Sequence, residues 1–329
     1  MAKKIPYGLT DYFRIVTEDF YYVDKTKYIE DLEKTAAFLF LIRPRRFGKS
    51  LFLNMLNCYY DVKYADRFEE LFGNQYIGKH PTAEQGKYLV LRFNFSMVRA
   101  TDDKLEAAFN RHISLETAYF ASVYASYFKP DFQEQLKLIP EAAGRLEYIC
   151  LCAKEQGLSI YLLIDEYDNF TNTILSSKGN DVYHSLTHDS GFYRSFFYVV
   201  KGVTTGAEAP VKRMFITGVS PVTLDDVTSG FNIGTNITTD ERFNSMVGFS
   251  ESELHEMLSY YQSEGMLVDS IDDIVRMMKP WYDNYCFAKE CIGQTMYNSD
   301  MVLYFLNNYL QKKRPPSEMV DRNIRTDYS

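Results

Sequence analysis

Short, wholly apolar segments that alternate with helix-like segments are the feature that most constrains this sequence of 329 residues. The stretches 37–42 and 159–164 contain no charged residue, as expected for strands that helices cover on both faces of a sheet. Two further stretches, 88–95 and 213–219, also have the composition of strands. Strands that alternate with helices need crossover connections, which produce a mostly parallel sheet. The pattern therefore predicts an α/β fold.

Helix-like segments lie between these strands. Apolar residues recur at helical spacing in 51–59, 102–128 and 141–156. Upstream, residues 21–32 change from an aromatic stretch to a polar start and then to helical spacing, which predicts a short strand followed by a helix.

Helical character dominates from residue 250 onward. Ser250 and Glu253 form a Ser-x-x-Glu capping pattern ahead of apolar residues that begin at Leu254. We therefore expect two parts: an α/β core in residues 1–249, and a helical lid subdomain with the start of a linker in residues 250–329.

The turn between the first apolar strand and its helix is a candidate phosphate-binding loop. It has the length and ending of the pattern G-x-x-x-x-G-K-[ST], with Arg43 in place of the first glycine. The N-terminus of the following helix presents unpaired N–H groups to an anion. Gly48 lets the backbone approach, Lys49 can reach the β- and γ-phosphates, and the Ser50 hydroxyl can bind Mg²⁺. The residues expected to contact a nucleotide are Arg43, Pro44, Arg45, Arg46, Phe47, Gly48, Lys49, Ser50 and Leu51.

The missing glycine leaves alternatives open. Pro44 removes a backbone N–H donor, so Arg45 and Arg46 can compensate with positive charge around the phosphates. They can equally be solvated side chains at the start of a helix, and the match itself can be fortuitous.

An acidic pair follows the strand at 159–164. Asp165 is positioned to hold hydrated Mg²⁺, and Glu166 is positioned to orient an attacking water. By itself such a pair often only caps a helix. Thr217, at the end of the strand at 213–219, can lie beside the phosphate loop and sense the γ-phosphate, or it can satisfy a turn ahead of Gly218. We therefore assign catalytic roles to Glu166, Lys49 and Thr217, and metal binding to Ser50 and Asp165.

Composition excludes other classes of protein. A formal net charge of −8 argues against general attraction to nucleic acid, which depends on Lys and Arg neutralising phosphates. The five cysteines include no C-x-x-C pair, so a reducing compartment fits best. The N-terminus lacks the apolar stretch of a signal peptide, and the early apolar run at 36–42 is too short to span a bilayer. A cytoplasmic location is the expectation.

Six separated motifs resemble the bacterial predicted AAA-ATPase, or AAA-ATPase-like, family, whose usual loop is the same R-P-R-R-F-G-K-S. They are Ile5–Gly8, Tyr22–Thr26, Arg43–Ser50, Leu163–Asp168, Thr217–Ser220 and Trp281–Tyr285. The resemblance implies a five-stranded P-loop NTPase sheet with flanking helices, a helical lid, and ATP and Mg²⁺ as ligands. Family members commonly continue into a C-terminal restriction-endonuclease-like domain, and residues 321–329 resemble the junction with it. Asn284 stands where the family usually carries glycine.

Three functions remain in competition. The first is ATP hydrolysis that drives a conformational change in an attached or partner domain, aided by an arginine from a neighbouring subunit of a homo-oligomer. The second is a nucleotide-gated interaction module without significant turnover, which binds a partner through Trp281 and Tyr282. Both side chains can instead pack into the core, as is usual for a lone tryptophan among apolar residues. The third, a nucleic-acid enzyme, rests on family analogy alone.

Overall fold

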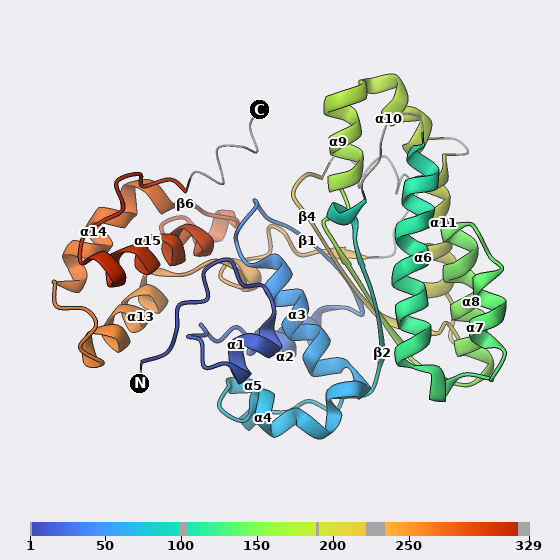
Figure 1. Cartoon of the computed structure of the whole chain (residues 1–329), viewed down its shortest axis with the longest axis horizontal. Coiled ribbons are helices and arrows are strands. Elements are labelled where there is room, and N and C mark those ends of the chain that lie inside the picture. Colours follow the sequence, from blue (N-terminus) through green and yellow to red (C-terminus); the bar gives the residue numbers. More distant parts are fainter. Residues whose placement is uncertain (1, 99–103, 189–190, 222–233, 322–329) are drawn as a thin grey trace.

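A five-stranded parallel sheet lies at the centre of the molecule (Figure 1) in the computed structural model, which describes residues 2–98, 104–188, 191–221 and 234–321. The strands are β1 (Phe38–Ile42), β2 (Leu89–Asn94), β3 (Ile160–Asp165), β4 (Val211–Gly218) and β5 (Thr235–Asn236). Their spatial order is β2-β3-β4-β1-β5, and every neighbouring pair is parallel. The predicted α/β fold is therefore confirmed, with the fifth strand that the family resemblance implied.

Helices fill the connections. They are α1 (Tyr12–Thr17), α2 (Tyr28–Thr35), α3 (Lys49–Tyr60), α4 (Phe68–Phe72), α5 (Tyr76–Lys79), α6 (Leu105–Val123), α7 (Phe132–Lys137), α8 (Ala142–Glu155), α9 (Asn169–Lys178), α10 (Asn180–Thr187), α11 (Phe192–Thr204), α13 (Glu251–Ser263), α14 (Ile271–Tyr282) and α15 (Ser299–Lys312). Short 3₁₀ helices follow α3 at Val62–Arg67 and β2 at Phe95–Met97. Two more, Glu241–Phe243 and Lys289–Cys291, lie in the C-terminal third, and Ala125–Tyr127 follows α6.

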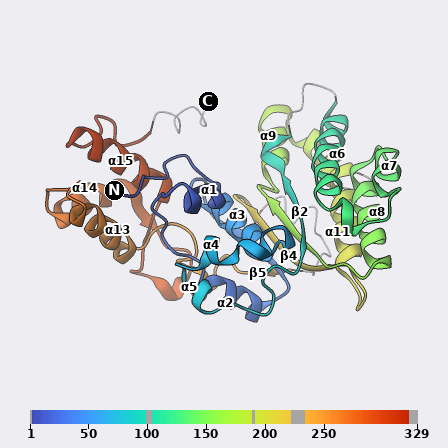
Figure 2. The same cartoon turned by 60° about the horizontal axis from the view of Figure 1, so that its bottom comes forward.

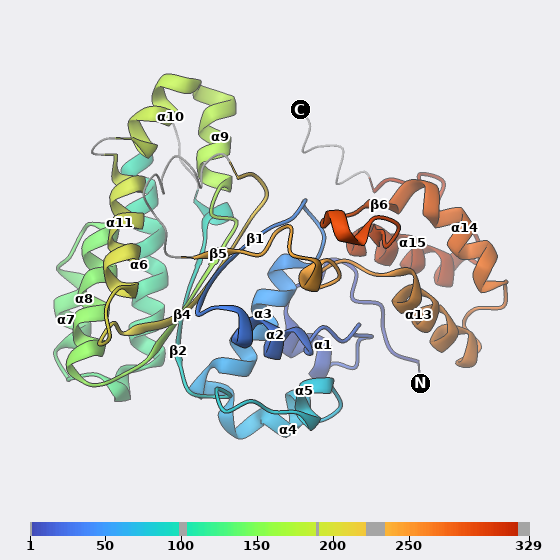
Figure 3. The ribbon, with the colours of Figure 1, turned by 180° about the vertical axis from the view of Figure 1, so that it is seen from behind.

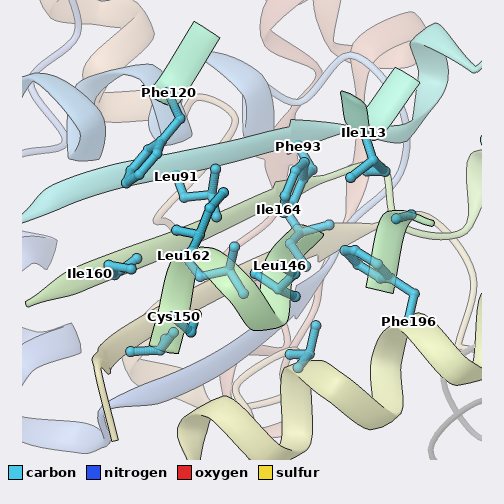
Figure 4. Close-up of a cluster of buried hydrophobic side chains, with 14 of the residues drawn as sticks. Leu91, Phe93, Ile113, Phe120, Leu146, Cys150, Ile160, Leu162, Ile164 and Phe196 are labelled. Carbon is cyan, nitrogen blue, oxygen red and sulfur yellow. The ribbon is translucent and has the colours of Figure 1, made fainter. Parts of the chain in front are cut away.

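The sheet separates two hydrophobic cores because side chains alternate between the faces of each strand. Along β3, Ile160, Leu162 and Ile164 point to the face covered by α6, α8 and α11 (Figure 4), whereas Tyr161 and Leu163 belong to the core that α1, α2 and α3 cover. Figures 2 and 3 show the same division from two other sides. Both faces of β3 are buried, which is why its sequence is wholly apolar up to Asp165.

The C-terminal helices α13, α14 and α15 pack around a third hydrophobic cluster, at the end of the molecule away from α7 and α8 (Figures 1 and 2). Helix α13 begins with the predicted capping box, in which Ser250 and Glu253 each bond the other's backbone N–H. An antiparallel pair, β6 (Asp283–Tyr285) and β7 (Met296–Tyr297), joins α14 to α15. This hairpin is not evident from the sequence, since each strand has only two or three residues.

The strand predicted early in 21–32 was wrong, although the helix predicted after it is α2. Phe20 makes only an isolated bridge with Lys4. The apolar residues of this stretch have another role, because Tyr21 and Val23 pack against the hydrophobic cluster of the C-terminal helices. Of the expected domain junction at 321–329, only Asp321 lies within the described residues. None of the helices in the described ranges is both long and apolar enough to cross a membrane.

Candidate functional site

The loop between β1 and α3 folds around the side chain of Lys49. Its ammonium Nζ donates hydrogen bonds to the carbonyl oxygens of Arg43, at 3.0 Å, and Pro44, at 2.9 Å. Lys49 is only 5 % exposed. Gly48 is the N-cap residue of α3 and has a φ of 88°, in the left-handed region that favours glycine. The loop therefore holds a buried cation next to the N-terminus of a helix.

Arg43 occupies the position of the missing glycine, and its side chain turns away from the loop. The guanidinium donates to the carbonyl oxygens of Ile42, Thr238 and Phe243 and stacks over the ring of Phe287, 4.1 Å from its centroid. Burial lowers its pKa to about 10. These contacts tie the end of β1 to the segments that follow β5 and β6. Of the expected nucleotide contacts, Arg43 thus offers only its backbone.

Arg46 joins the loop to α15. Its φ of 68° is unusual for a residue other than glycine, and its Nη1 lies 3.1 Å from Oδ2 of Asp300 and 3.9 Å from Oδ2 of Asp321. The carbonyl oxygen of Arg46 in turn accepts from the N–H of Asp300 and the hydroxyl of Ser299. The first turn of α15 is therefore docked on the phosphate loop.

The remaining loop residues divide between two hollows and the core. Pro44 and Arg45 line a hollow of about 490 Å³ together with Trp281 and Tyr285. Phe47 is fully buried and meets Tyr285 edge-on, at a centroid distance of 4.7 Å. Ser50 and Leu51 line a second, smaller hollow beside Lys49.

The acidic pair lies at the end of β3, and β4 separates this strand from β1 and its loop. Asp165 is 2 % exposed and accepts a hydrogen bond of 2.6 Å from the Thr217 hydroxyl, which is fully buried at the end of β4. Burial lowers the pKa of Lys49, and the charges of Asp165 and Glu166 oppose this shift. The structure thus links Lys49 to the acidic pair through their charges and links Thr217 to Asp165 through a hydrogen bond.

Glu166 has an unusual backbone conformation. Its φ is 50°, a region that non-glycine residues rarely occupy and that often marks functional sites. The carboxylate accepts a hydrogen bond of 3.1 Å from Nδ2 of Asn169. Burial and the nearby charge of Asp165 raise its pKa, against the influence of Lys49 and Arg45.

A cavity of about 280 Å³ connects these groups to the C-terminal helices. The polar part of its lining comprises Thr10, Lys25, Arg46, Lys49, Ser50, Glu166, Ser299 and Asp300. Apolar walls come from three regions, the N-terminal segment, the residues before α13, and helices α13 and α15. They include Pro6, Leu9, Tyr21, Val23, Met246, Val247, Phe249, Met257 and Leu303. The cavity therefore combines charged groups with largely apolar walls.

Local sequence patterns gave no sign of these apolar walls. Two motifs that supported the family resemblance, Ile5–Gly8 and Tyr22–Thr26, supply part of the lining, but neither has a spacing of charged residues or glycines that indicates a ligand. Met246, Met257 and Asp300 are distant in the chain from the phosphate loop. They reach the site only through the packing of the C-terminal helices.

The fold and the site together define a class. A parallel sheet in which a phosphate-type loop follows β1, an acidic pair ends β3, and β4 lies between them is a P-loop NTPase-like fold. The family model described as "Predicted AAA-ATPase" matches residues 6–228, and the chain belongs to this family.

A curated relative extends the comparison beyond the α/β core. The chain is 26% identical over 312 residues to an "Uncharacterized protein in vnfD 5'region" from Azotobacter chroococcum mcd 1. The match covers 92% of this chain and 52% of the relative. The chain thus spans about half the length of the curated relative.

Proposed function

We propose that this chain binds ATP with Mg²⁺ and hydrolyses the ATP to ADP and phosphate. The observation that carries the proposal is the cavity in which the loop residues Lys49 and Ser50 and the side chain of Glu166 share a lining with largely apolar walls. A triphosphate needs cationic and N–H donors, whereas a purine base needs apolar walls with few polar groups. The loop and the C-terminal helices supply these two environments side by side.

The residues of the loop between β1 and α3 that line the cavity bind and orient the phosphates. The Lys49 ammonium, which now bonds two loop carbonyls, exchanges them for the more strongly charged phosphate oxygens. The first N–H groups of α3 and the Gly48 backbone add donors that point the same way. Arg46 lines both this cavity and the neighbouring hollow and is the arginine that we expect to meet phosphate, whereas Arg45 lines only the hollow.

The donor set beside the phosphates suits a hard cation. A carboxylate at Asp165 and hydroxyls at Ser50 and Thr217 are the oxygen ligands that Mg²⁺ prefers, with the remainder from water and phosphate. When bound, Mg²⁺ neutralises charge that develops on the phosphates. The Thr217 hydroxyl, which donates to Asp165, fixes the orientation of that carboxylate.

Glu166 orients the attacking water and accepts its proton. The raised pKa of Glu166 brings the carboxyl closer to the working pH, which suits a proton acceptor. The residues in catalytic roles are then Glu166, Lys49 and Thr217.

We further propose that nucleotide state is transmitted to the C-terminal helices, which act as a lid with its boundary near residue 250. The contacts of Arg46 with Ser299 and Asp300 support this role. In the full-length protein the lid would act on an attached domain, such as the nuclease-like domain that the family resemblance implied, or on a partner.

A second candidate function is a nucleotide-gated interaction module that holds ATP without turnover. The exposed Trp281 favours it, because this side chain is 56 % exposed whereas its neighbour Tyr282 is buried. Large aromatic side chains in solvent are frequent anchors for partners. The interpretation that placed Trp281 in the core was therefore wrong, whereas it was right for Tyr282.

Turnover of ATP by the purified chain separates these functions. We expect Mg²⁺-dependent release of phosphate that is lost in Glu166→Gln while ATP binding persists. Adding nucleic acid to a parallel reaction tests the third function, and size measurements with and without ATP test a homo-oligomer. Binding without turnover in the parent chain would favour the interaction module, and no binding at all would refute both functions.

A further inference from the structure

The acidic pair is followed directly by Tyr167 and Asp168, to which the proposed function gives no role. Asp168 is 1 % exposed, and its carboxylate accepts hydrogen bonds from the backbone N–H groups of Val219, at 3.1 Å, and Ser220. It also accepts from Nδ2 of Asn172 in α9. The residues after β3 and the residues after β4 are thus joined by one buried carboxylate.

The direct hydrogen-bond partners of this carboxylate are N–H donors, and the charge of Lys49 also acts on it. Within the part of the chain that the structure describes, Asp168 forms no ion pair. A buried carboxylate needs such donors, since an uncompensated charge is strongly unfavourable. The requirement fixes where Val219 and Ser220 lie, and therefore where the end of β4 lies.

A close backbone contact reinforces the same junction. The N–H of Tyr167 donates to the carbonyl oxygen of Thr217 at 3.0 Å, and the Tyr167 hydroxyl donates to the carbonyl oxygen of Ser220. A Cβ atom at Gly218 would lie 2.1 Å from Cε1 of Tyr167, so only glycine fits between the ring and β4. Thr217 is consequently held in place by the hydrogen bond to its own carbonyl oxygen and by the packing of Gly218 against Tyr167.

We propose that Asp168 is a positioning residue that keeps the Thr217 hydroxyl on Asp165 and thereby sets the affinity for Mg²⁺–ATP. The inference rests on the proposed function, because it gives Asp165 and Thr217 a metal to serve. Groups that orient a metal ligand commonly change metal affinity or activity by about 10- to 100-fold when they are removed. Asp168 acts through the backbone of residues 217–220 and does not itself touch the nucleotide.

The test measures ATP affinity with Mg²⁺ and with EDTA in the parent chain, Asp168→Ala and Asp168→Asn. Asp168→Ala should lose about tenfold or more of its affinity in Mg²⁺ and change little in EDTA. Asp168→Asn keeps one acceptor oxygen and should lose less, which covers the case in which Asp168→Ala does not fold. Asp11→Ala is the matched control, because Asp11 is the N-cap residue of α1 as Asp168 is of α9 and its carboxylate also accepts from a backbone N–H, that of Arg14; the change should leave both affinities unchanged.

A second readout needs no nucleotide. Hydrogen exchange of the peptide that contains residues 217–220 should be faster in Asp168→Ala than in the parent, since two N–H groups lose their acceptor. In a double-mutant cycle, Asp168→Ala should add little to the effect of Thr217→Val on Mg²⁺–ATP affinity, because both changes act on one interaction.

The outcomes are distinct. Additive effects, or an unchanged Mg²⁺ dependence in Asp168→Ala and Asp168→Asn, would overturn the positioning role while leaving the proposed function in place. A parent chain that binds no ATP would overturn the proposed function and this inference together.

Discussion

Lys49 is a buried ammonium that donates to two carbonyl oxygens, which phosphate oxygens would replace in the proposed function. We predict that Lys49→Ala weakens ATP binding by roughly ten- to a hundredfold, the equivalent of a hydrogen bond to a charged group. Titration with a labelled ATP analogue measures the change. Lys34→Ala, which removes an exposed ammonium paired with Glu30, is the control. Unchanged affinity in folded Lys49→Ala would remove the loop from the proposed site.

Glu166 should give ATP turnover a recognisable pH dependence. Its pKa is raised above the usual glutamate value of 4.5, chiefly by burial, and a water-activating carboxyl must be ionised. Turnover should therefore fall as the pH drops through the raised pKa, with a midpoint above 4.5. The folded state binds this proton more tightly than the unfolded state, so Glu166 destabilises the fold as the pH rises, and Glu166→Gln should relieve that cost. A midpoint at or below the usual value would contradict this role.

The contacts of Arg43 indicate a role in the stability of the fold rather than in ligand binding. Arg43→Ala removes the guanidinium donor from the carbonyl oxygens of Ile42 and Thr238, whereas that of Phe243 keeps the N–H of Met246, and each unsatisfied buried group costs about 1–3 kcal/mol. We therefore predict a loss of at least about 2 kcal/mol in the free energy of unfolding, measured by urea denaturation. A variant with parental stability and impaired ATP binding would show instead that Arg43 serves the nucleotide.

These residues also mark what sequence could predict at this scale. The sequence around Gly48 and Lys49 predicted a turn from a strand into a helix, and the sequence around Asp165 and Glu166 predicted an acidic pair after a second strand; the structure has both. Arg43 differs, because its acceptors belong to Thr238 and Phe243. No local pattern connects residues so far apart in the chain.

At the scale of elements, the junction between β3 and β4 depends on the absence of a side chain at Gly218. Gly218→Ala should destabilise the protein by about 1–3 kcal/mol, the usual cost of overpacking, because the added methyl would overlap Tyr167. Gly202 in α11 has open space around its Cβ position. Gly202→Ala is the matched change, and it should stabilise by about 0.5–1 kcal/mol through helix propensity. Equal effects in urea denaturation would contradict the close packing.

Long elements with a clear period were predictable, and short ones were not. Strands β1 to β4 and helices α3, α6 and α8 have apolar patterns that tertiary packing then used. The two residues of β5 and the hairpin β6–β7 are too short for any period to show. Their pairing is decided by what lies beside them.

At the scale of the whole molecule, the docking of α15 on the loop should oppose phosphate binding. The Asp300 carboxylate lines the cavity and competes with phosphate for the guanidinium of Arg46. We therefore predict that Asp300→Asn binds ATP several-fold more tightly, in line with about 1 kcal/mol for a partly exposed ion pair. Isothermal titration measures it, and adenosine, which has no phosphate, should bind equally to both forms. Weaker ATP binding in Asp300→Asn would mean that the carboxylate supports the site.

The apolar walls of the cavity are the part of the site that could not be predicted from the sequence. Met246 and Met257 look like ordinary core residues, and only their position between the loop and α15 gives them another use. Half of the site could thus be inferred from chemistry, and the other half only from tertiary structure.

The strand order has a consequence for how the chain is made. Phe38 of β1 pairs with Met214 of β4, and Leu39 pairs with Thr235 of β5, so both edges of β1 wait for residues that are synthesised much later. At ribosomal rates of about 5–20 residues per second, that delay is on the order of ten seconds or more. During this time the apolar strand β1 has no partner. Unpaired apolar strands tend to aggregate, and chaperones bind them. The loop on which the proposed activity depends is therefore translated well before the strands that flank β1.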